Sequence, residues 1–287
     1  MAVHLPATVD EAVEHLAATP SSTVLAGGTD LMVEVNDGHR RPSGVVVVVN
    51  RIPELRSWRY DPRTATVTIG SAVTYSEMLD GPLATLVPAL SEAARTVGSP
   101  QIRNAGTLGG NVGTSSPAGD GLPVLSALGA EVELASATGR RQLPFDEFMI
   151  GVKRTALAPG ELIVSVTLPV VDGWQGYAKV GVRNAMVIAV ASACVVLDRS
   201  QRQVAVALGS VGSTILRCAA AEAHLAATLD WSTLSASDAD LARFGELVSA
   251  ASRPITDHRS SAEYRRHAVG VLARRLVRRA SRSDVAA

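Results

Sequence analysis

Aromatic side chains make up only 3% of this 287-residue chain, although 47% of its residues are hydrophobic. Any buried core must therefore be built mainly from Val, Leu, Ile and Ala. Neither sign of charge is in excess, because 27 basic residues face 27 acidic ones. This balance argues against a general electrostatic grip on nucleic acid or on an anionic membrane. The composition is that of a globular protein, and the length allows two or three compact units.

Long apolar stretches are also missing. The longest, Ala185 to Leu197, is interrupted by Ser192 and falls short of the roughly 20 residues that a transmembrane helix needs. The first residues, Met1 to Pro6, lack the basic and apolar segments of a secretory signal. We therefore expect a cytoplasmic protein without a membrane span.

Cysteine is scarce, with only Cys194 and Cys218, and these form no CxxC pair. A disulfide framework is not expected, which agrees with a reducing compartment. Two cysteines cannot ligate even one [2Fe–2S] cluster, because such a cluster takes four protein ligands. If electrons pass through iron–sulfur centres, those centres belong to another chain.

Several catalytic motifs are absent too. The six histidines are scattered without HxxH or HExxH spacing, so no metal site is expected. No serine stands in a GxSxG elbow, so a hydrolase triad has no support. Neither the dinucleotide fingerprint GxGxxG nor the P-loop motif is present.

The periodicity of the sequence predicts an α+β fold in three parts. Residues 1–55 read as a small α/β unit, in which Thr8 and Glu11 form a capping box at the start of the first helix. Residues 56–171 alternate with period two in several places, which favours a unit built on a mixed sheet. We expect these two subdomains to form one domain, 1–171, followed by a C-terminal domain, 174–282, of antiparallel strands and a helical bundle.

Individual elements follow from the same patterns. The predicted strands are 23–26, 45–49, 64–70, 130–134, 162–168, 177–182, 187–197 and 204–211. The predicted helices are 8–17, 31–35, 76–79, 88–97, 123–127, 217–229, 238–252 and 260–280.

Two glycine turns carry the chemistry of the sequence. The first is Ala26-Gly27-Gly28-Thr29-Asp30, and the second runs from Ala105 to Asn111 with Gly106, Gly109 and Gly110 inside it. Glycine lets the backbone approach a ligand closely and can point successive N–H groups at a phosphate oxygen. Nearby hydroxyl groups add donors. From the residues alone, the turns indicate an anion or nucleotide site, and ordinary tight turns stay open as the alternative.

The segments 101–111 and 116–120 resemble the flavin-binding segment of molybdenum hydroxylases, the family of xanthine and carbon monoxide dehydrogenases. The segment 25–31 is similar to that family's first FAD loop, and 261–267 resembles its C-terminal domain. The resemblance implies an FAD-binding medium subunit, with FAD held by binding residues rather than by catalytic ones. It assigns to FAD the following residues: Leu25, Ala26, Gly27, Gly28, Thr29, Asp30, Gly106, Thr107, Gly110, Asn111, Thr114, Ser116, Asp120, Ile163 and Lys179.

Within that set the resemblance implies different roles. The residues from Leu25 to Asp30 would line the pyrophosphate and adenosine side, whereas Asp120 would accept hydrogen bonds from cofactor hydroxyls. Ile163 would pack on the flavin and Lys179 would reach it. The family often has an acidic residue where this chain has Val187, so a local ion-pair network is expected to be missing here.

The resemblance further implies an electron-transfer subunit that works with an iron–sulfur subunit and a molybdopterin subunit, as a dimer of heterotrimers. NAD is among the candidate acceptors. The first loop looks more like the xanthine dehydrogenase branch than the carbon monoxide branch. Two alternatives remain: a free-standing FAD-dependent oxidoreductase, and a non-enzymatic nucleotide-binding protein. The eight arginines from Arg259 to Arg282 indicate a solvated helix face or a docking surface for an acidic subunit.

Overall fold

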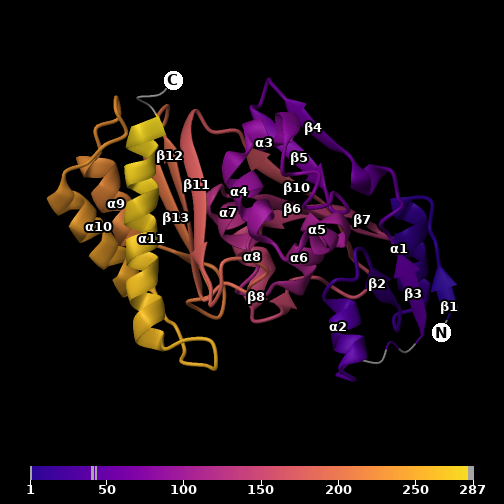
Figure 1. Cartoon of the computed structure of the whole chain (residues 1–287). Coiled ribbons are helices and arrows are strands. Elements are labelled where there is room, and N and C mark those ends of the chain that lie inside the picture. Colours follow the sequence, from indigo (N-terminus) through magenta and orange to yellow (C-terminus); the bar gives the residue numbers. More distant parts are fainter. Residues whose placement is uncertain (1, 40–41, 43, 284–287) are drawn as a thin grey trace. The chain divides into compact units, whose positions relative to one another are not determined.

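The computed structural model describes residues 2–39, 42 and 44–283. Runs of several strands and runs of several helices follow one another along the chain, and the sheets are separate (Figure 1). By its internal contacts the chain divides into two compact units. Unit 1 comprises residues 1–78, 99–115 and 129–169, and unit 2 comprises 79–98, 116–128 and 170–287. The units are thus interleaved in sequence, whereas the two predicted domains are continuous.

The first part of unit 1 is a small α/β layer. Its three strands, β1 (Ala2–His4), β3 (Val45–Val48) and β2 (Thr23–Leu25), are parallel with β3 in the centre. Helix α1 (Val9–Ala18) begins at Thr8, whose hydroxyl accepts the N–H of Glu11 at 3.1 Å. The Glu11 carboxylate accepts the N–H of Ala7 at 2.7 Å, so the capping box closes one residue earlier than predicted. Helix α2 (Leu31–Asn36) follows the first glycine loop.

The second part of unit 1 is a five-stranded sheet. Its order is β4 (Trp58–Asp61), β5 (Thr66–Gly70), β10 (Leu162–Pro169), β6 (Glu131–Ser136) and β7 (Gly139–Pro144). Every neighbouring pair is antiparallel, so the predicted mixed sheet is corrected to an antiparallel one. The short elements of this part are η1 (Glu54–Arg56), α5 (Pro100–Ala105), α6 (Leu108–Thr114), α8 (Phe145–Phe148), β8 (Met149–Gly151) and β9 (Arg154–Thr155).

One apolar core joins the two parts of unit 1. The buried face of α1, with Val9, Val13 and Leu16, packs against Val47 of the small sheet and Val164 of the large one. These aliphatic side chains provide the favourable burial that the scarce aromatics cannot. The small layer and the five-stranded sheet are therefore parts of a single packed body.

Unit 2 is built on the antiparallel sheet β11 (Gly173–Val180), β12 (Ala191–Asp198), β13 (Gln203–Gly209) and β14 (Leu216–Arg217). Helices α9 (Ala219–Thr228), α10 (Asp238–Ala251) and α11 (Ala262–Ser283) bury a common core against it (Figure 1). Helices α3 (Gly81–Leu86), α4 (Pro88–Thr96) and α7 (Leu122–Ala127) also belong to this unit. Contacts of α4 with β11 and of α7 with β13 place both beside the sheet.

The predicted α+β class is confirmed, and most predicted elements are present within a few residues of their expected bounds. The predicted helix at 76–79 is wrong, because this segment forms a turn. Its N–H groups are used elsewhere: Tyr75 donates to Gly106 O at 3.0 Å and Ser76 donates to Arg103 O at 3.2 Å. Glu77 and Met78 donate to the carbonyl oxygens of Thr74 and Tyr75, three residues back, which is the bond pattern of a turn and not of an α-helix.

Candidate functional site

The two glycine turns lie against each other in unit 1. A Cβ atom on Gly27 would overlap the carbonyl group of Ala105, and one on Gly106 would come within 3.5 Å of Thr29 Oγ1. The hydroxyl of Thr114, at the end of α6, donates to Asp30 Oδ2 at 2.8 Å. Glycine at position 27 is thus required by the close approach of two backbones. The structure therefore brings the two predicted loops into one cluster.

The first loop has free hydrogen-bond donors. Within the described residues, the backbone N–H groups of Gly27, Gly28 and Thr29 donate to no protein acceptor. Gly28 has φ of 72°, the left-handed region, which glycine enters without a steric penalty. Successive unsatisfied N–H groups around a left-handed residue form a concave anion site, or nest. The pattern fits a phosphate oxygen at this loop.

The second turn differs from its prediction. The N–H groups of Leu108, Gly109 and Asn111 donate to Val73 O at 3.0 Å, Ser71 O at 2.8 Å and Thr107 O at 3.1 Å. The hydroxyl of Thr107 accepts the N–H of Gly110 at 3.0 Å and caps α6. These donors are therefore already used inside the chain, where the sequence predicts that they point at phosphate. The turn can offer close backbone approach, but these amides do not form a second nest.

What the second turn does offer is space and an unpaired acceptor. A Cβ on Gly110 would meet only Thr107 Oγ1, at 3.0 Å, so the surface above Gly110 is otherwise open. The side-chain oxygen Oδ1 of Asn111 is buried and has no hydrogen-bond partner among the described residues. A buried polar atom without a protein partner can accept a hydrogen bond from a bound ligand. Both features fit a cofactor with hydrogen-bonding groups.

Ile163 also belongs to this cluster. It lies on β10, next to an irregularity in the pairing of β10 with β6 between Ile163 and Ser165. Its Cδ1 atom would lie 3.3 Å from a Cβ on Gly113 of α6. The structure thus places Ile163 beside the helix that follows the second turn.

The other three predicted residues, Ser116, Asp120 and Lys179, lie in unit 2. There, Asp120 and Lys179 form an ion pair of 2.7 Å between Oδ2 and Nζ, with side chains 9% and 7% exposed. The ammonium group also donates to Thr96 O at 2.9 Å and to Val187 O at 3.0 Å. Lysine has three N–H donors, and all of them therefore have acceptors inside the chain.

Tyr177 completes this buried network, and the sequence reasoning missed it. Its hydroxyl donates to Asp120 Oδ1 at 2.7 Å. Burial raises the pKa of Asp120, an effect that the positive charge of Lys179 opposes. Burial also raises the pKa of the Tyr177 hydroxyl well above its ordinary value, and the Asp120 carboxylate adds to this rise. Positions 177 and 179 share one face of a strand, which is the signal that could have found the pair.

The carbonyl of Val187 accepts a hydrogen bond from Lys179 Nζ, so the residue at this departure from the family pattern contributes through its backbone. Arg183 donates to the carbonyl oxygens of Ala185 and Met186 and so folds the loop on itself. The loop 181–190 is held to β11 through the Val187 carbonyl and through the Val190 N–H, which donates to Val180 O at 2.8 Å.

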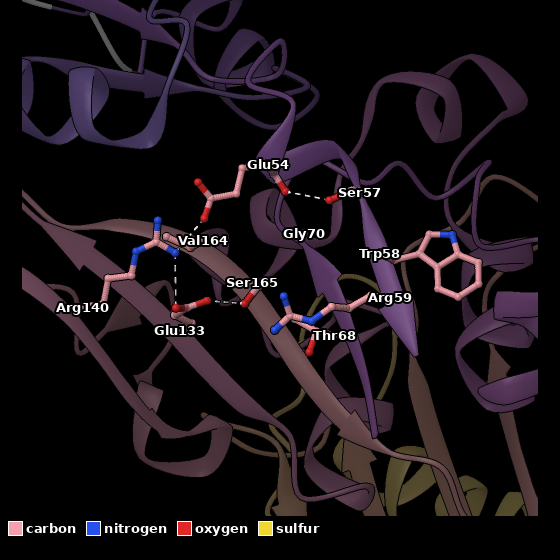
Figure 2. Close-up of a pocket in the computed structure, with 10 residues that line it drawn as sticks. All are labelled: Glu54, Ser57, Trp58, Arg59, Thr68, Gly70, Glu133, Arg140, Val164 and Ser165. Carbon is pink, nitrogen blue, oxygen red and sulfur yellow. Dashed lines mark hydrogen bonds and ion pairs between the residues drawn. The ribbon is translucent and has the colours of Figure 1, made fainter. Parts of the chain in front are cut away.

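A separate hollow of about 160 Å³ lies in unit 1 beside the five-stranded sheet (Figure 2). Arg140 stands between Glu54 and Glu133, with ion pairs of 2.6 Å and 3.4 Å. The hydroxyl of Ser165 donates to Glu133 at 2.7 Å. The charges of Arg140, Glu54 and Glu133 in this hollow are largely compensated by one another, and none of the predicted cofactor residues lines it.

Over residues 2–39, 42 and 44–283, no group of three or more His, Cys, Asp or Glu side chains is placed to hold a metal ion. In the same ranges no helix is long and apolar enough to cross a membrane. Both cysteines are free and buried.

Comparison with known proteins identifies the family. Residues 1–171 match the FAD binding domain in molybdopterin dehydrogenase, and residues 177–280 match the CO dehydrogenase flavoprotein C-terminal domain. Over 276 residues the chain is 32% identical to the nicotine 6-hydroxylase medium subunit of Paenarthrobacter nicotinovorans, covering 95% of this chain and 94% of the relative. A stretch of 193 residues is 36% identical to the nicotinate dehydrogenase FAD-subunit of Eubacterium barkeri, covering 64% of each chain.

A likeness to a solved structure extends over the whole length. In reconstituted CO dehydrogenase from Oligotropha carboxidovorans, one chain is 30% identical with a TM-score of 0.88, covering 98% of this chain and 97% of that one. The matches cover both units, and the unsatisfied donors of the first loop fit the pyrophosphate of the expected cofactor. The chain belongs to the FAD-binding subunits of the molybdenum hydroxylases, a family of oxidoreductases, and FAD is its cofactor.

Proposed function

We propose that this chain passes electrons from iron–sulfur clusters to an external acceptor through its FAD. The observation that carries the proposal is the pairing of the nest at Gly27–Thr29 with the open surface at Gly110, in a chain with only two cysteines, both buried. When bound, FAD supplies the redox chemistry, while the protein positions it and sets its electronics. The clusters and a molybdopterin would then belong to partner chains.

In this proposal the residues of unit 1 hold the cofactor. The N–H groups of Gly27, Gly28 and Thr29 donate to a phosphate oxygen, and Asn111 Oδ1 accepts from a cofactor hydroxyl. Leu25, Ala26 and Asp30 flank the same loop. Gly106, Thr107, Gly110 and Thr114 shape the surface against which the cofactor lies, and Ile163 gives an apolar contact.

For the residues of unit 2 we propose more indirect roles. Lys179 would act on the flavin through its charge, because its three donors are already used inside the chain. Asp120 would retain free lone pairs for a cofactor hydroxyl, since each carboxylate oxygen can accept more than one hydrogen bond. Ser116 would contribute its hydroxyl on the same segment.

The complex we favour is of the xanthine dehydrogenase type, with an iron–sulfur subunit and a molybdopterin subunit in a dimer of heterotrimers, and NAD is among its candidate acceptors. The sequence of the first loop, Ala26 to Asp30, supports this branch over the carbon monoxide branch. The relatives are named for different substrates, among them nicotine and nicotinate. Substrate choice therefore belongs to the partner chain that carries the molybdenum.

The test is purification of the tagged chain from its own host. We expect a yellow preparation with flavin absorbance that copurifies with chains bearing molybdenum and iron–sulfur clusters. A colourless chain that does not take up added FAD would refute the proposal. A yellow chain that purifies alone and oxidises a substrate would instead support a free-standing oxidoreductase.

A further inference from the structure

The helix α2, directly after the first glycine loop, is tied to the second turn by two carboxylates. Asp30 and Glu34 stand four residues apart, one helical turn, so their side chains lie on the same face. Asp30 accepts the hydroxyl of Thr114 at 2.8 Å, and Glu34 forms an ion pair of 2.7 Å with Lys153. Both links connect α2 to the end of α6, because Thr114 is its last residue and the Lys153 N–H donates to the O atom of the next residue, Ser115, at 3.0 Å.

Lys153 occupies a special position. It is at the tip of the β8–β9 hairpin with φ of 53°, a left-handed conformation that costs a non-glycine residue free energy. Its backbone is held at the end of α6 while its side chain reaches α2. Lysine is rare in this chain, in which only Lys153 and Lys179 are present against many arginines. The strained backbone of Lys153 places its ammonium group within reach of α2.

We propose that Lys153 and Glu34 form a strap that holds the phosphate loop against the α6 turn and thereby slows release of FAD. This inference rests on the proposed binding of FAD at these loops. The strap is a positioning device, because neither side chain needs to touch the cofactor. If α2 moves away from α6, the nest at Gly27–Thr29 moves with it, since Met32 N–H donates to Gly28 O at 2.9 Å.

The charge of the strap matters as well. Among the residues of the two loops, the charged one is Asp30, and Glu34 adds a second negative charge one turn away. Lys153 neutralises Glu34, so an anionic pyrophosphate nearby meets less repulsion. Its side chain is 55% exposed, so the ion pair is screened by salt and its effect is modest.

The experiment measures the FAD dissociation rate of the full chain by stopped-flow flavin fluorescence. For Lys153→Met and Glu34→Gln we expect a rate roughly two- to five-fold above wild type, with the association rate little changed. The double variant should release FAD no faster than the faster of the two single variants, because either substitution alone already removes the ion pair. Lys153→Arg should keep the wild-type rate, and the acceleration of wild-type release by salt should be smaller in Lys153→Met.

The matched control is Arg154→Met. Arg154 is exposed on the same hairpin, and its side chain has no ion-pair partner among residues 2–39, 42 and 44–283. This variant removes one positive charge from the same hairpin and should release FAD at the wild-type rate. The apo forms of all variants should unfold at the wild-type temperature, which separates a loose strap from a damaged fold.

Two results would overturn the strap. One is a dissociation rate in Lys153→Met that equals wild type or Arg154→Met. The other is a slower release in Glu34→Gln, which would show that only the local charge matters. If the wild-type chain itself binds no FAD, the proposed function fails instead, and the two failures are therefore distinguishable.

Discussion

Gly109 and Gly110 are neighbours in α6 but serve different purposes. A Cβ on Gly109 would overlap the Cβ of Ser71 and come within 2.7 Å of its carbonyl oxygen, so this glycine is needed for packing. A Cβ on Gly110 would meet only Thr107 Oγ1. The first position therefore supports the fold, and the second keeps a surface free.

This difference predicts opposite phenotypes. Gly110→Val should lose FAD while the apo protein unfolds near the wild-type temperature, because the branched side chain fills the space in front of the turn. Gly109→Ala should lower the free energy of unfolding by about 1–3 kcal/mol through overpacking. Flavin content and a thermal melt of each variant check the pair. Normal flavin content in Gly110→Val would refute the proposed contact between Gly110 and FAD.

The buried pair of Asp120 and Lys179 gives a prediction about pH. In Lys179→Met the Asp120 carboxylate is left buried without its opposite charge, a change that typically costs about 3–5 kcal/mol. The pKa of Asp120 is already raised by burial and should rise further. A carboxyl group whose pKa is higher in the folded state binds a proton on folding, so lower pH favours the folded state.

The free energy of unfolding of Lys179→Met should therefore increase as the pH is lowered from 7 to 5, which urea titrations at several pH values measure. Asp120→Asn/Lys179→Met removes both charges and should lose this pH dependence. If the single variant instead loses stability on acidification, the buried carboxylate does not control its folding.

At the scale of elements, the edge of the unit 2 sheet is closed by a side chain. Strand β11 is at the edge, and the Tyr177 N–H donates to Glu92 Oε2 of α4 at 2.7 Å. Arg279 of α11 donates to the same oxygen at 2.6 Å and lies over the Trp174 ring, 5.1 Å from its centre. One carboxylate thus connects two helices with the strand between them.

We expect Glu92→Ala to destabilise the chain by about 1–2 kcal/mol, because it leaves a partly buried N–H without its acceptor. Glu92→Gln keeps an acceptor for that N–H and should cost less. Arg279→Met breaks the ion pair and leaves the bond to Tyr177 intact. Urea unfolding followed by tryptophan fluorescence measures the free energy of unfolding of each variant. An equal loss of stability in all three variants would contradict the role of the hydrogen bond from the Tyr177 N–H.

Local patterns predict long elements better than short ones in this chain. The apolar run of β10 is legible in the sequence because its side chains are buried, and the capping box of α1 because Thr8 and Glu11 lie three residues apart in one segment. The short helix α6 is missed, since its glycines disfavour helix and it forms only with help from the carbonyl groups of Ser71 and Val73. Such help comes from residues more than 30 positions away.

The candidate site divides in the same way. The first loop is predictable, because its glycines and its left-handed Gly28 are properties of the segment itself. The internal use of the α6 amides and the strap of Lys153 with Glu34 depend on distant partners. The spacing of residues in the sequence predicts neither of these interactions. The resemblance to a family indicates which residues bind the cofactor but not which of their hydrogen-bond donors remain free.

For the whole molecule, the expected consequence of FAD binding is stabilisation. A ligand that binds only the folded chain at a concentration of a hundred times its Kd adds about 2.7 kcal/mol at 25 °C. The thermal midpoint should therefore rise by several degrees as FAD is added, and by less in Gly110→Val. AMP and riboflavin, tested separately, should each give a smaller rise. An unchanged midpoint in saturating FAD would argue against the site.

The interleaving of the two compact units has a consequence for biosynthesis. Helices α4 and α7 are made early, yet they belong to a unit whose core is completed by Val277 and Ala280 of α11. The α11 segment must therefore leave the ribosome before that unit can close, and until then these helices have their apolar faces exposed. The two matched domains meet between residues 171 and 177, but a fragment ending there would contain α4 and α7 without the rest of their unit. The boundary between the two matched domains is thus a poor place to divide the chain into separately expressed fragments.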